Sequence, residues 1–231
     1  MKKTNEELKK IIFEKSDLSD EDKLRIFNNN YKDWQTKHEY IYKRFNINFN
    51  DKILDIGCSF GHNLIHFSQD SVGIEIQQPI INFLNSLGLN VKSINVEDDL
   101  RKMDEKFDLI WCTDFLVHTI SPYKFLYDCR HVLNDNGRIV IQIPLMSIWN
   151  THRSSCHFYG FNKKALLYIF EMSGYKIIKT SGLIRKLPSW LNKILEPVLQ
   201  IWGGNIWVLA EKQSHVPINT KKVYPPSWFK L

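Results

Sequence analysis

The sequence predicts an α/β fold, with helices on both faces of one doubly wound, mostly parallel sheet. Short apolar runs alternate with helix-like segments along most of the 231 residues. The run Phe107–Cys112 is apolar at all but one position, as expected of a parallel strand that is buried on both faces. In the stretch Ile53–Leu64, a short apolar run leads into a glycine turn and then into a segment that can begin a helix.

Residues 1–50 are expected to form a helical lead-in to the sheet. Thr4 and Glu7 have the spacing of a capping box at the start of a first helix. The acidic run Ser19–Asp22 marks the start of a second helix, and residues 31–45 have the pattern of a third.

Seven strands are expected after this lead-in, separated by helices and turns. From their short apolar runs, the strands are placed at residues 52–56, 71–76, 90–94, 107–112, 138–143, 175–180 and 205–211. From periodicity and end signals, the helices between them are placed at residues 62–68, 79–87, 122–133 and 162–173. Because Gly203 and Gly204 turn the chain, the last strand is expected to run antiparallel. The domain is therefore placed at 51–212, followed by a basic, aromatic tail at 213–231.

The composition indicates an ordered chain and argues against export or membrane insertion. Apolar residues make up 43% of the sequence, which is enough for a core. No apolar run reaches the roughly 20 residues of a membrane span, and the N-terminus lacks the apolar segment of a secretory signal. The four cysteines lie far apart without a C-x-x-C pair, as expected of reduced thiols. A cytoplasmic location is therefore expected.

The net charge of +6 is concentrated near the C-terminus. From Lys176 onward there are nine Lys and Arg residues against two acids. Such a region fits an anionic substrate, an anionic membrane surface, nucleic acid other than DNA, or a solvated surface. Residues 185–202 add a broad apolar face, for which packing on the sheet, a lid over a substrate and peripheral membrane contact all stay open. The oligomeric state is not predicted.

The glycine turn after the first strand is the most informative motif. Gly57 and Gly61 can adopt backbone angles that are closed to other residues, and they let the main chain approach a ligand closely. The dinucleotide fingerprint G-x-G-x-x-G would require glycines at Ser59 and His62, so NAD and FAD are disfavoured. The phosphate-binding pattern G-x-x-x-x-G-K-[ST] is absent as well.

This turn resembles the D-x-G-x-G-x-G motif of class I S-adenosylmethionine-dependent methyltransferases. Asp55, Gly57 and Gly61 match the motif, and Ser59 replaces its middle glycine. With the order of strands and helices, the resemblance extends over residues 30–212. It implies the Rossmann-like methyltransferase fold, with S-adenosylmethionine as cofactor and S-adenosylhomocysteine as product.

The resemblance implies further cofactor contacts at the ends of later strands. Glu75, at the end of the second strand, would accept hydrogen bonds from the ribose hydroxyls. After the third strand, Asn95 would accept from the adenine amine and the Val96 N–H would reach a ring nitrogen. Glu97 or Asp98 can take the place of Asn95, or these acids can simply cap a helix. The residues predicted to bind the cofactor are Asp55, Gly57, Ser59, Gly61, Glu75, Ile76, Asn95, Val96 and Cys112.

The segment Asp108–His118 resembles the fourth motif of the same family, and it is similar to the pattern of the type 11/12 group that acts on small molecules and glycans. His118 matches the family histidine, but Val117 stands where many relatives have glutamate. Some relatives bind a divalent metal through two acids and this histidine, so no metal is expected here, although His152 or His157 could complete an unusual site. The loop that carries these two histidines lies where relatives place a substrate loop.

The resemblance predicts methyl transfer to a hydroxyl or amine of a small molecule or glycan precursor. A hydroxyl acceptor needs a nearby base, and the candidates for that base are His118, His152 and His157. Two alternatives stay open. The basic C-terminal region is compatible with an RNA methyltransferase, and a non-catalytic S-adenosylmethionine-binding subunit of a complex would carry the same cofactor motif.

Overall fold

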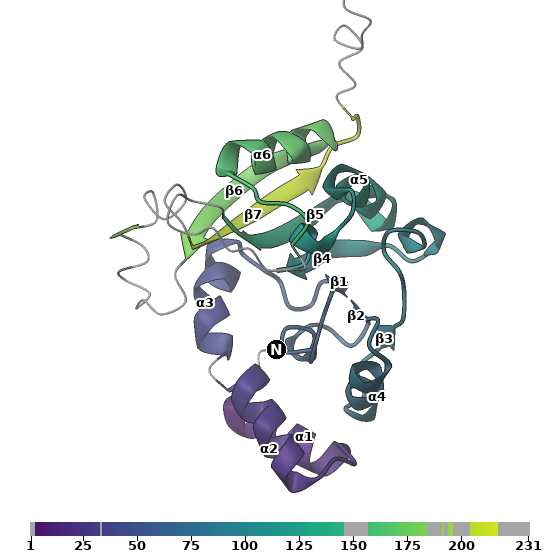
Figure 1. Ribbon diagram of the computed structural model, residues 1–231, viewed down its shortest axis with the longest axis vertical. Coiled ribbons are helices and arrows are strands. Elements are labelled where there is room, and N and C mark those ends of the chain that lie inside the picture. The colour runs from purple at the N-terminus through teal and green to yellow at the C-terminus, as the bar shows by residue number, and fades with distance from the viewer. Residues whose placement is uncertain are drawn as a thin grey trace, which may run out of the picture.

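The protein folds as a seven-stranded sheet between two layers of helices (Figure 1). The computed structural model describes residues 3–32, 34–145, 157–183, 191, 194–195 and 204–216. The strands are β1 (Ile53–Ile56), β2 (Val72–Ile74), β3 (Val91–Lys92), β4 (Phe107–Thr113), β5 (Leu133–Pro144), β6 (Tyr175–Leu183) and β7 (Asn205–Lys212). Their order across the sheet is β3-β2-β1-β4-β5-β7-β6.

The described sheet is parallel except for β7, which lies antiparallel between β5 and β6. Val140 of β5 is paired with Leu209 of β7, and Thr180 of β6 is paired with Val208. The predicted α/β class and the predicted reversal of the last strand are therefore confirmed. Because β7 inserts between its two neighbours, it also contributes the buried residues Trp207 and Ala210 to the middle of the sheet.

The helices divide between the two faces of the sheet. They are α1 (Asn5–Lys15), α2 (Asp20–Ile26), α3 (Trp34–Arg44), α4 (Gln78–Ser86), α5 (Pro122–Val132) and α6 (Lys163–Met172). Shorter turns are the π-helical η1 (Phe27–Tyr31) and the 3₁₀ turns η2 (Leu64–His66), η3 (Leu100–Lys102) and η4 (Leu116–His118). Side chains from α1, α3 and α4 pack with Trp111 and Trp207 on one face, whereas α5 and α6 pack with Ile110 and Val208 on the other.

Local signals for the first helix act as predicted. The Glu7 N–H donates to Thr4 Oγ1 at 3.2 Å, and Glu7 Oε2 accepts from the Thr4 N–H at 2.7 Å. This capping box satisfies backbone groups that the start of a helix leaves unpaired. Leu8 and Ile12, one turn apart, are the buried face of α1.

Three predicted elements differ from the structure. The helix expected at 62–68 is only the single turn η2, because Phe67 turns extended and its ring lies 6.1 Å from that of Trp111 in the core. β3 has two residues instead of five. Residues 134–137, which lie outside the predicted fifth strand at 138–143, belong to β5, where Asn136 has φ 59° and the register against β4 shifts. Packing and bulge geometry override the local periodicity at these places.

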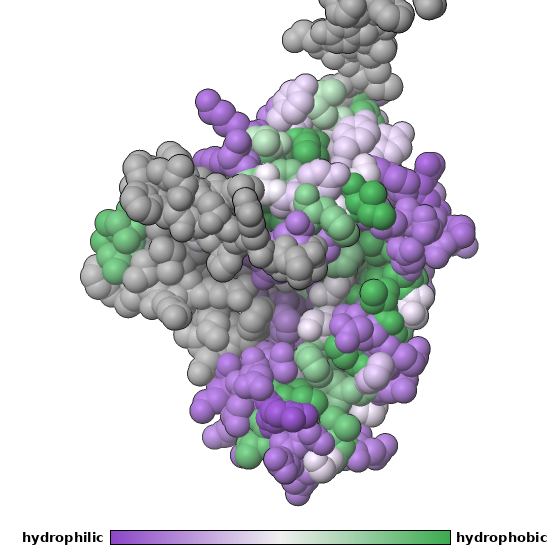
Figure 2. All heavy atoms as spheres, in the orientation of Figure 1, coloured by the Kyte–Doolittle hydropathy of each residue, from purple (hydrophilic) through white to green (hydrophobic). Residues whose placement is uncertain are grey.

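On the face shown in Figure 2, hydrophilic side chains cover much of the N-terminal helices, with hydrophobic side chains scattered among them. No helix in the described part of the chain is both long enough and apolar enough to cross a bilayer. Apart from residues 191, 194 and 195, the segment 185–202 lies outside the described residues, as does the end of the predicted tail from residue 217. The three predictions for that segment therefore stay predictions.

Candidate active site

A cavity of about 700 Å³ lies at the carboxyl ends of β1, β2 and β4. The strand order reverses beside β1, since β2 follows on one side and β4 on the other. In open α/β sheets, ligands bind at such a switch point. The predicted cofactor residues that line this cavity are Gly57, Ser59, Glu75, Ile76, Asn95 and Val96. The fold thus brings together three motifs that are distant in the sequence.

The glycine turn is shaped by the protein's own core. Gly57 has φ +69° and Gly61 has φ +70°, in the left-handed region that favours glycine. A Cβ on Gly57 would lie 2.6 Å from Phe115 Cδ2, and one on Gly61 would lie 2.7 Å from Leu84 Cδ2. A larger residue at either position would therefore require Phe115 or Leu84 to shift, in addition to the strain of a positive φ. The packing of these neighbours is a second reason why glycine occupies positions 57 and 61, and the sequence motif does not show it.

Glu75 holds one wall of the cavity together through its carboxylate. Its Oε1 accepts from the N–H groups of Ile76 at 2.8 Å and Gln77 at 3.0 Å, and its Oε2 accepts from the N–H of Ser59 at 3.2 Å. Ser59 itself has φ 47°, so it takes the conformation of the glycine that it replaces. A carboxylate has about four acceptor positions, so these three bonds orient Glu75 and leave it able to accept from a ribose hydroxyl.

Three predicted cofactor residues, Asp55, Gly61 and Cys112, are not among the residues that line the cavity. Asp55 is 1% exposed and accepts from the backbone N–H of Leu64, while its Oδ2 has no hydrogen-bond partner among the described residues. Burial raises the pKa of Asp55 to about 8. Cys112 is fully buried, and its neighbours Thr113 and Asp114 line the cavity in its place.

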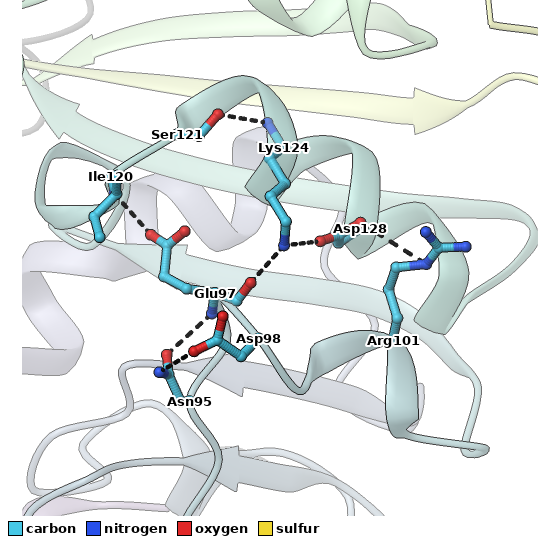
Figure 3. A network of polar contacts seen from close by, with 8 residues as sticks. All are labelled: Asn95, Glu97, Asp98, Arg101, Ile120, Ser121, Lys124 and Asp128. Atoms are coloured by element: carbon cyan, nitrogen blue, oxygen red, sulfur yellow. Dashed lines mark hydrogen bonds and ion pairs between the residues drawn. The ribbon is translucent and has the colours of Figure 1, made fainter.

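The turn after β3 lines the cavity through Asn95, Val96 and Glu97, and the polar contacts of this turn are drawn in Figure 3. Asn95 Oδ1 accepts from the Glu97 N–H at 3.1 Å, and Asn95 Nδ2 donates to Asp98 Oδ2 at 2.8 Å. Val96 is buried. The Asn95 side chain therefore shapes its own turn and keeps acceptor capacity on Oδ1, since an amide oxygen has two lone pairs.

Two of the three predicted catalytic histidines lie together. His118 lines the cavity, and the ring of His157 packs edge-on against it with centroids 4.8 Å apart. The segment that carries His157 is held over η4 because the Phe158 N–H donates to the Val117 carbonyl at 2.9 Å. His152 lies outside the described residues.

Val117 and Asp114, which belong to the fourth motif, make contacts within the protein. Val117 is 1% exposed and packs in the core that also contains Leu116 and Phe125. Asp114 accepts a hydrogen bond from Gln142 Nε2 at 2.9 Å. Across the ranges that the structure describes, no group of three or more His, Cys, Asp or Glu residues could hold a metal ion.

Comparison with known proteins agrees with this geometry. A solved S-adenosylmethionine-dependent methyltransferase from Archaeoglobus fulgidus superposes on 82% of this chain and 99% of its own, with a TM-score of 0.59 and 17% identity. Residues 54–141, which contain the glycine turn and the strands around the cavity, match the family described as a methyltransferase domain of type 11. Residues 54–141 thus match a methyltransferase domain, and the chain has the fold of solved S-adenosylmethionine-dependent methyltransferases.

Curated relatives of the methyltransferase differ in their reactions. A ubiquinone biosynthesis O-methyltransferase of Glaesserella parasuis is 29% identical over 115 residues, which are 44% of this chain and 49% of the relative. A tRNA U34 carboxymethyltransferase of Campylobacter jejuni is 29% identical over 121 residues, 47% of this chain and 41% of the relative. The chain therefore matches less than half the length of these relatives.

Side chains from the N-terminal helices form hydrogen bonds with the glycine turn. The sequence motifs did not predict these contacts. The Tyr31 hydroxyl donates to the carbonyl of Phe60 within the turn. At the end of the turn, Asn63 Oδ1 accepts from the Tyr42 hydroxyl at 2.7 Å and lies 3.1 Å from His38 Nδ1. Since an amide oxygen cannot donate, His38 carries its proton on Nδ1. The sequence signal that could have predicted these contacts is the spacing of Tyr31, His38 and Tyr42 within residues 1–50.

Replacing Gly57 by alanine is expected to lower the free energy of unfolding by about 3 kcal/mol, because the new Cβ meets Phe115 and φ is positive. Gly88→Ala is the matched control. Gly88 also has a positive φ (+82°), but its nearest neighbour is Lys15 Nζ at 3.5 Å, so only the backbone strain applies. Urea denaturation measures both variants. Equal destabilisation of the two would contradict the packing argument.

Proposed function

We propose that the methyltransferase acts on a hydroxyl or amine of a small molecule or glycan precursor. The observation that carries this proposal is the His118–His157 pair, with His118 on the wall of the cofactor cavity. Histidine is the side chain most often used to accept a proton in catalysis. A hydroxyl acceptor needs such a base as it attacks, and an amine acceptor must be deprotonated first. The curated O-methyltransferase relative supports an oxygen acceptor.

The proposal includes one orientation for the cofactor in the cavity. Glu75 would accept from the ribose, Asn95 and Val96 would meet the adenine, and Gly57 and Ser59 would lie along the methionine part. When bound, S-adenosylmethionine supplies a methyl group on a sulfonium that is already activated for displacement. The protein then has to hold the acceptor in line at about 3–3.5 Å from the methyl carbon, and to exclude water. His118 and Thr113 lie on the wall where this placement would occur.

A test of the base uses single alanine substitutions at His118, His152 and His157. Release of S-adenosylhomocysteine is first measured on a panel of phenols, sugar nucleotides and amines to find an accepted substrate. At least one variant is then expected to lose about 10²–10⁴-fold in turnover, which is the usual contribution of general base catalysis.

The control for this test is His131→Ala. His131 is an exposed residue at the end of α5, outside the cavity lining. It is expected to keep wild-type turnover. Binding of S-adenosylhomocysteine is measured for each variant, so that a loss of cofactor is told apart from a loss of chemistry. Unchanged turnover in all three histidine variants would rule out the proposed base.

A second candidate function is methylation of RNA. It is favoured by the tRNA-modifying relative and by the basic C-terminal region. A protein that binds RNA through Lys and Arg loses affinity steeply as salt rises, because phosphate contacts release counterions. Binding of bulk tRNA that falls steeply between low and physiological salt, together with methyl incorporation into it, would favour this candidate over the small-molecule proposal.

A further inference from the structure

A network of polar contacts ties the turn after β3 to the chain before and within α5 (Figure 3). The turn carries Asn95, Val96 and Glu97, all of which line the cofactor cavity. His118 and Thr119, which directly precede Ile120, also line the cavity. The network therefore joins two segments of the chain that both contribute to the cavity lining.

The first connection is made by the side chain of Glu97. Its Oε1 accepts from the Ile120 N–H at 2.7 Å. The same peptide segment is held from its other side, since the Ile120 carbonyl accepts from the Tyr159 hydroxyl at 2.7 Å. Ile120 is thus an anchor with both backbone groups in use. A carboxylate that bonds a fixed N–H is itself oriented, so Glu97 is directed toward Ile120.

The second connection is made by Lys124, near the start of α5. Its Nζ donates to the backbone carbonyl of Glu97 and pairs with Asp128 Oδ2 at 2.7 Å. Asp128 is 3% exposed and also faces the Arg101 guanidinium at 3.9 Å. Because Asp128 is buried on the helix, it holds the ammonium of Lys124 in place beneath the turn. Both the main chain and the side chain of Glu97 are therefore bound to the region of α5.

We propose that Glu97 and Lys124 are positioning residues that set the adenine end of the cofactor cavity. They hold the turn so that Asn95 and Val96 meet the adenine, and the Glu97 carboxylate does not itself accept from the adenine amine. The proposal rests on the cofactor orientation given above, in which the adenine lies beside this turn. The proposal assigns different roles to Asn95 and Glu97, which the sequence motif left as alternative acceptors for the adenine amine.

The experiment measures binding of two ligands by calorimetry, with competition where binding is weak. One is S-adenosylhomocysteine, and the other is S-inosylhomocysteine, in which a carbonyl replaces the adenine amine. Glu97→Ala is expected to weaken both ligands by the same factor, roughly tenfold, which corresponds to one lost charge-assisted hydrogen bond. A loss confined to the adenosyl ligand would show that Glu97 accepts from the amine, and would overturn the proposal.

Conservative variants separate positioning from a general loss of structure. Glu97→Gln keeps an oxygen that can accept from the Ile120 N–H, and Lys124→Arg keeps donors for Glu97 and Asp128, so both are expected to retain most of the affinity. Lys124→Met is expected to behave like Glu97→Ala. The double variant should lose less than the product of the two single effects, because both residues hold one turn. Wild-type affinity in Lys124→Met would overturn the proposal.

Matched controls come from α6, which lies away from the cavity. Lys164→Met and Glu171→Ala replace exposed residues of the same types, and neither lines the cavity. Both are expected to bind the two ligands as the wild type does. The readout is binding of the product without any acceptor, so failure here is distinct from failure of the proposed acceptor chemistry, which is measured as turnover.

Discussion

Replacing Glu75 by alanine is expected to weaken binding of S-adenosylhomocysteine by about a hundredfold. The substitution removes the proposed acceptor for the ribose and also leaves the N–H groups of Ser59, Ile76 and Gln77 without the oxygens that now accept from them. A charge-assisted hydrogen bond contributes about 1.5–3 kcal/mol, so losing the ribose contact and the order of the wall together accounts for this factor. Calorimetric titration of the purified variant measures it.

Glu75→Gln refines this expectation. The amide oxygen of glutamine can replace Oε1 and accept from Ile76 and Gln77, but the amide nitrogen then faces the Ser59 N–H, and two donors cannot bond. This variant should therefore lie between the wild type and Glu75→Ala in affinity. Glu171→Ala, on the far helix α6, serves as the control for loss of a carboxylate. Affinity within about threefold of wild type in Glu75→Ala would contradict the proposed orientation of the cofactor.

Asp55→Asn is expected to change how the stability of the protein depends on pH. Burial raises the pKa of Asp55 from 3.8 to about 8, so between these values the folded state holds a proton that the unfolded state has lost. The free energy of unfolding then falls as the pH rises from about 4 to about 8, and it levels off above that range. The full change is on the order of 5 kcal/mol, since each pKa unit corresponds to about 1.4 kcal/mol.

Urea denaturation from pH 4 to pH 9 checks this prediction. Asparagine does not titrate, and its oxygen can still accept from the Leu64 N–H. The stability of Asp55→Asn relative to the wild type should therefore rise over this range. The control is Asp135→Asn, whose wild-type side chain is fully exposed, and its difference from the wild type should stay flat. A flat difference for Asp55→Asn as well would contradict a raised pKa at this position.

Local sequence motifs predicted those residues of the candidate site whose position depends on a single strand and the turn after it. The acid at the end of β2 and the glycine turn directly follow a strand, and His118 lies in the short turn η4 after β4, so the strand order places all three at one edge of the sheet. The same holds for the reversed β7, because paired glycines before it are visible locally. These strands form because their apolar runs are buried, and such runs are easy to recognise in a sequence.

Contacts between elements could not be predicted in this way. The bond from Tyr31 to Phe60 and the bonds of Asn63 depend on how the lead-in helices lie on the sheet, which no local pattern encodes. The same is true of the Glu97–Ile120 bond. The helix expected at 62–68 was wrong for a related reason, since burial of Phe67 against Trp111 is a gain that only the assembled core provides.

The corner where β5, β6 and β7 meet has a consequence for where the sequence of the chain can vary. Leu145, just after β5, forms a bridge with Phe161, and Pro144 and Leu183 are both paired with Asn205. The stretches 146–160 and 184–204 therefore each begin and end next to residues that are paired at this one corner. We expect exchanges within either stretch to leave the register of the strands unchanged, because the pairs that set this register lie outside both stretches.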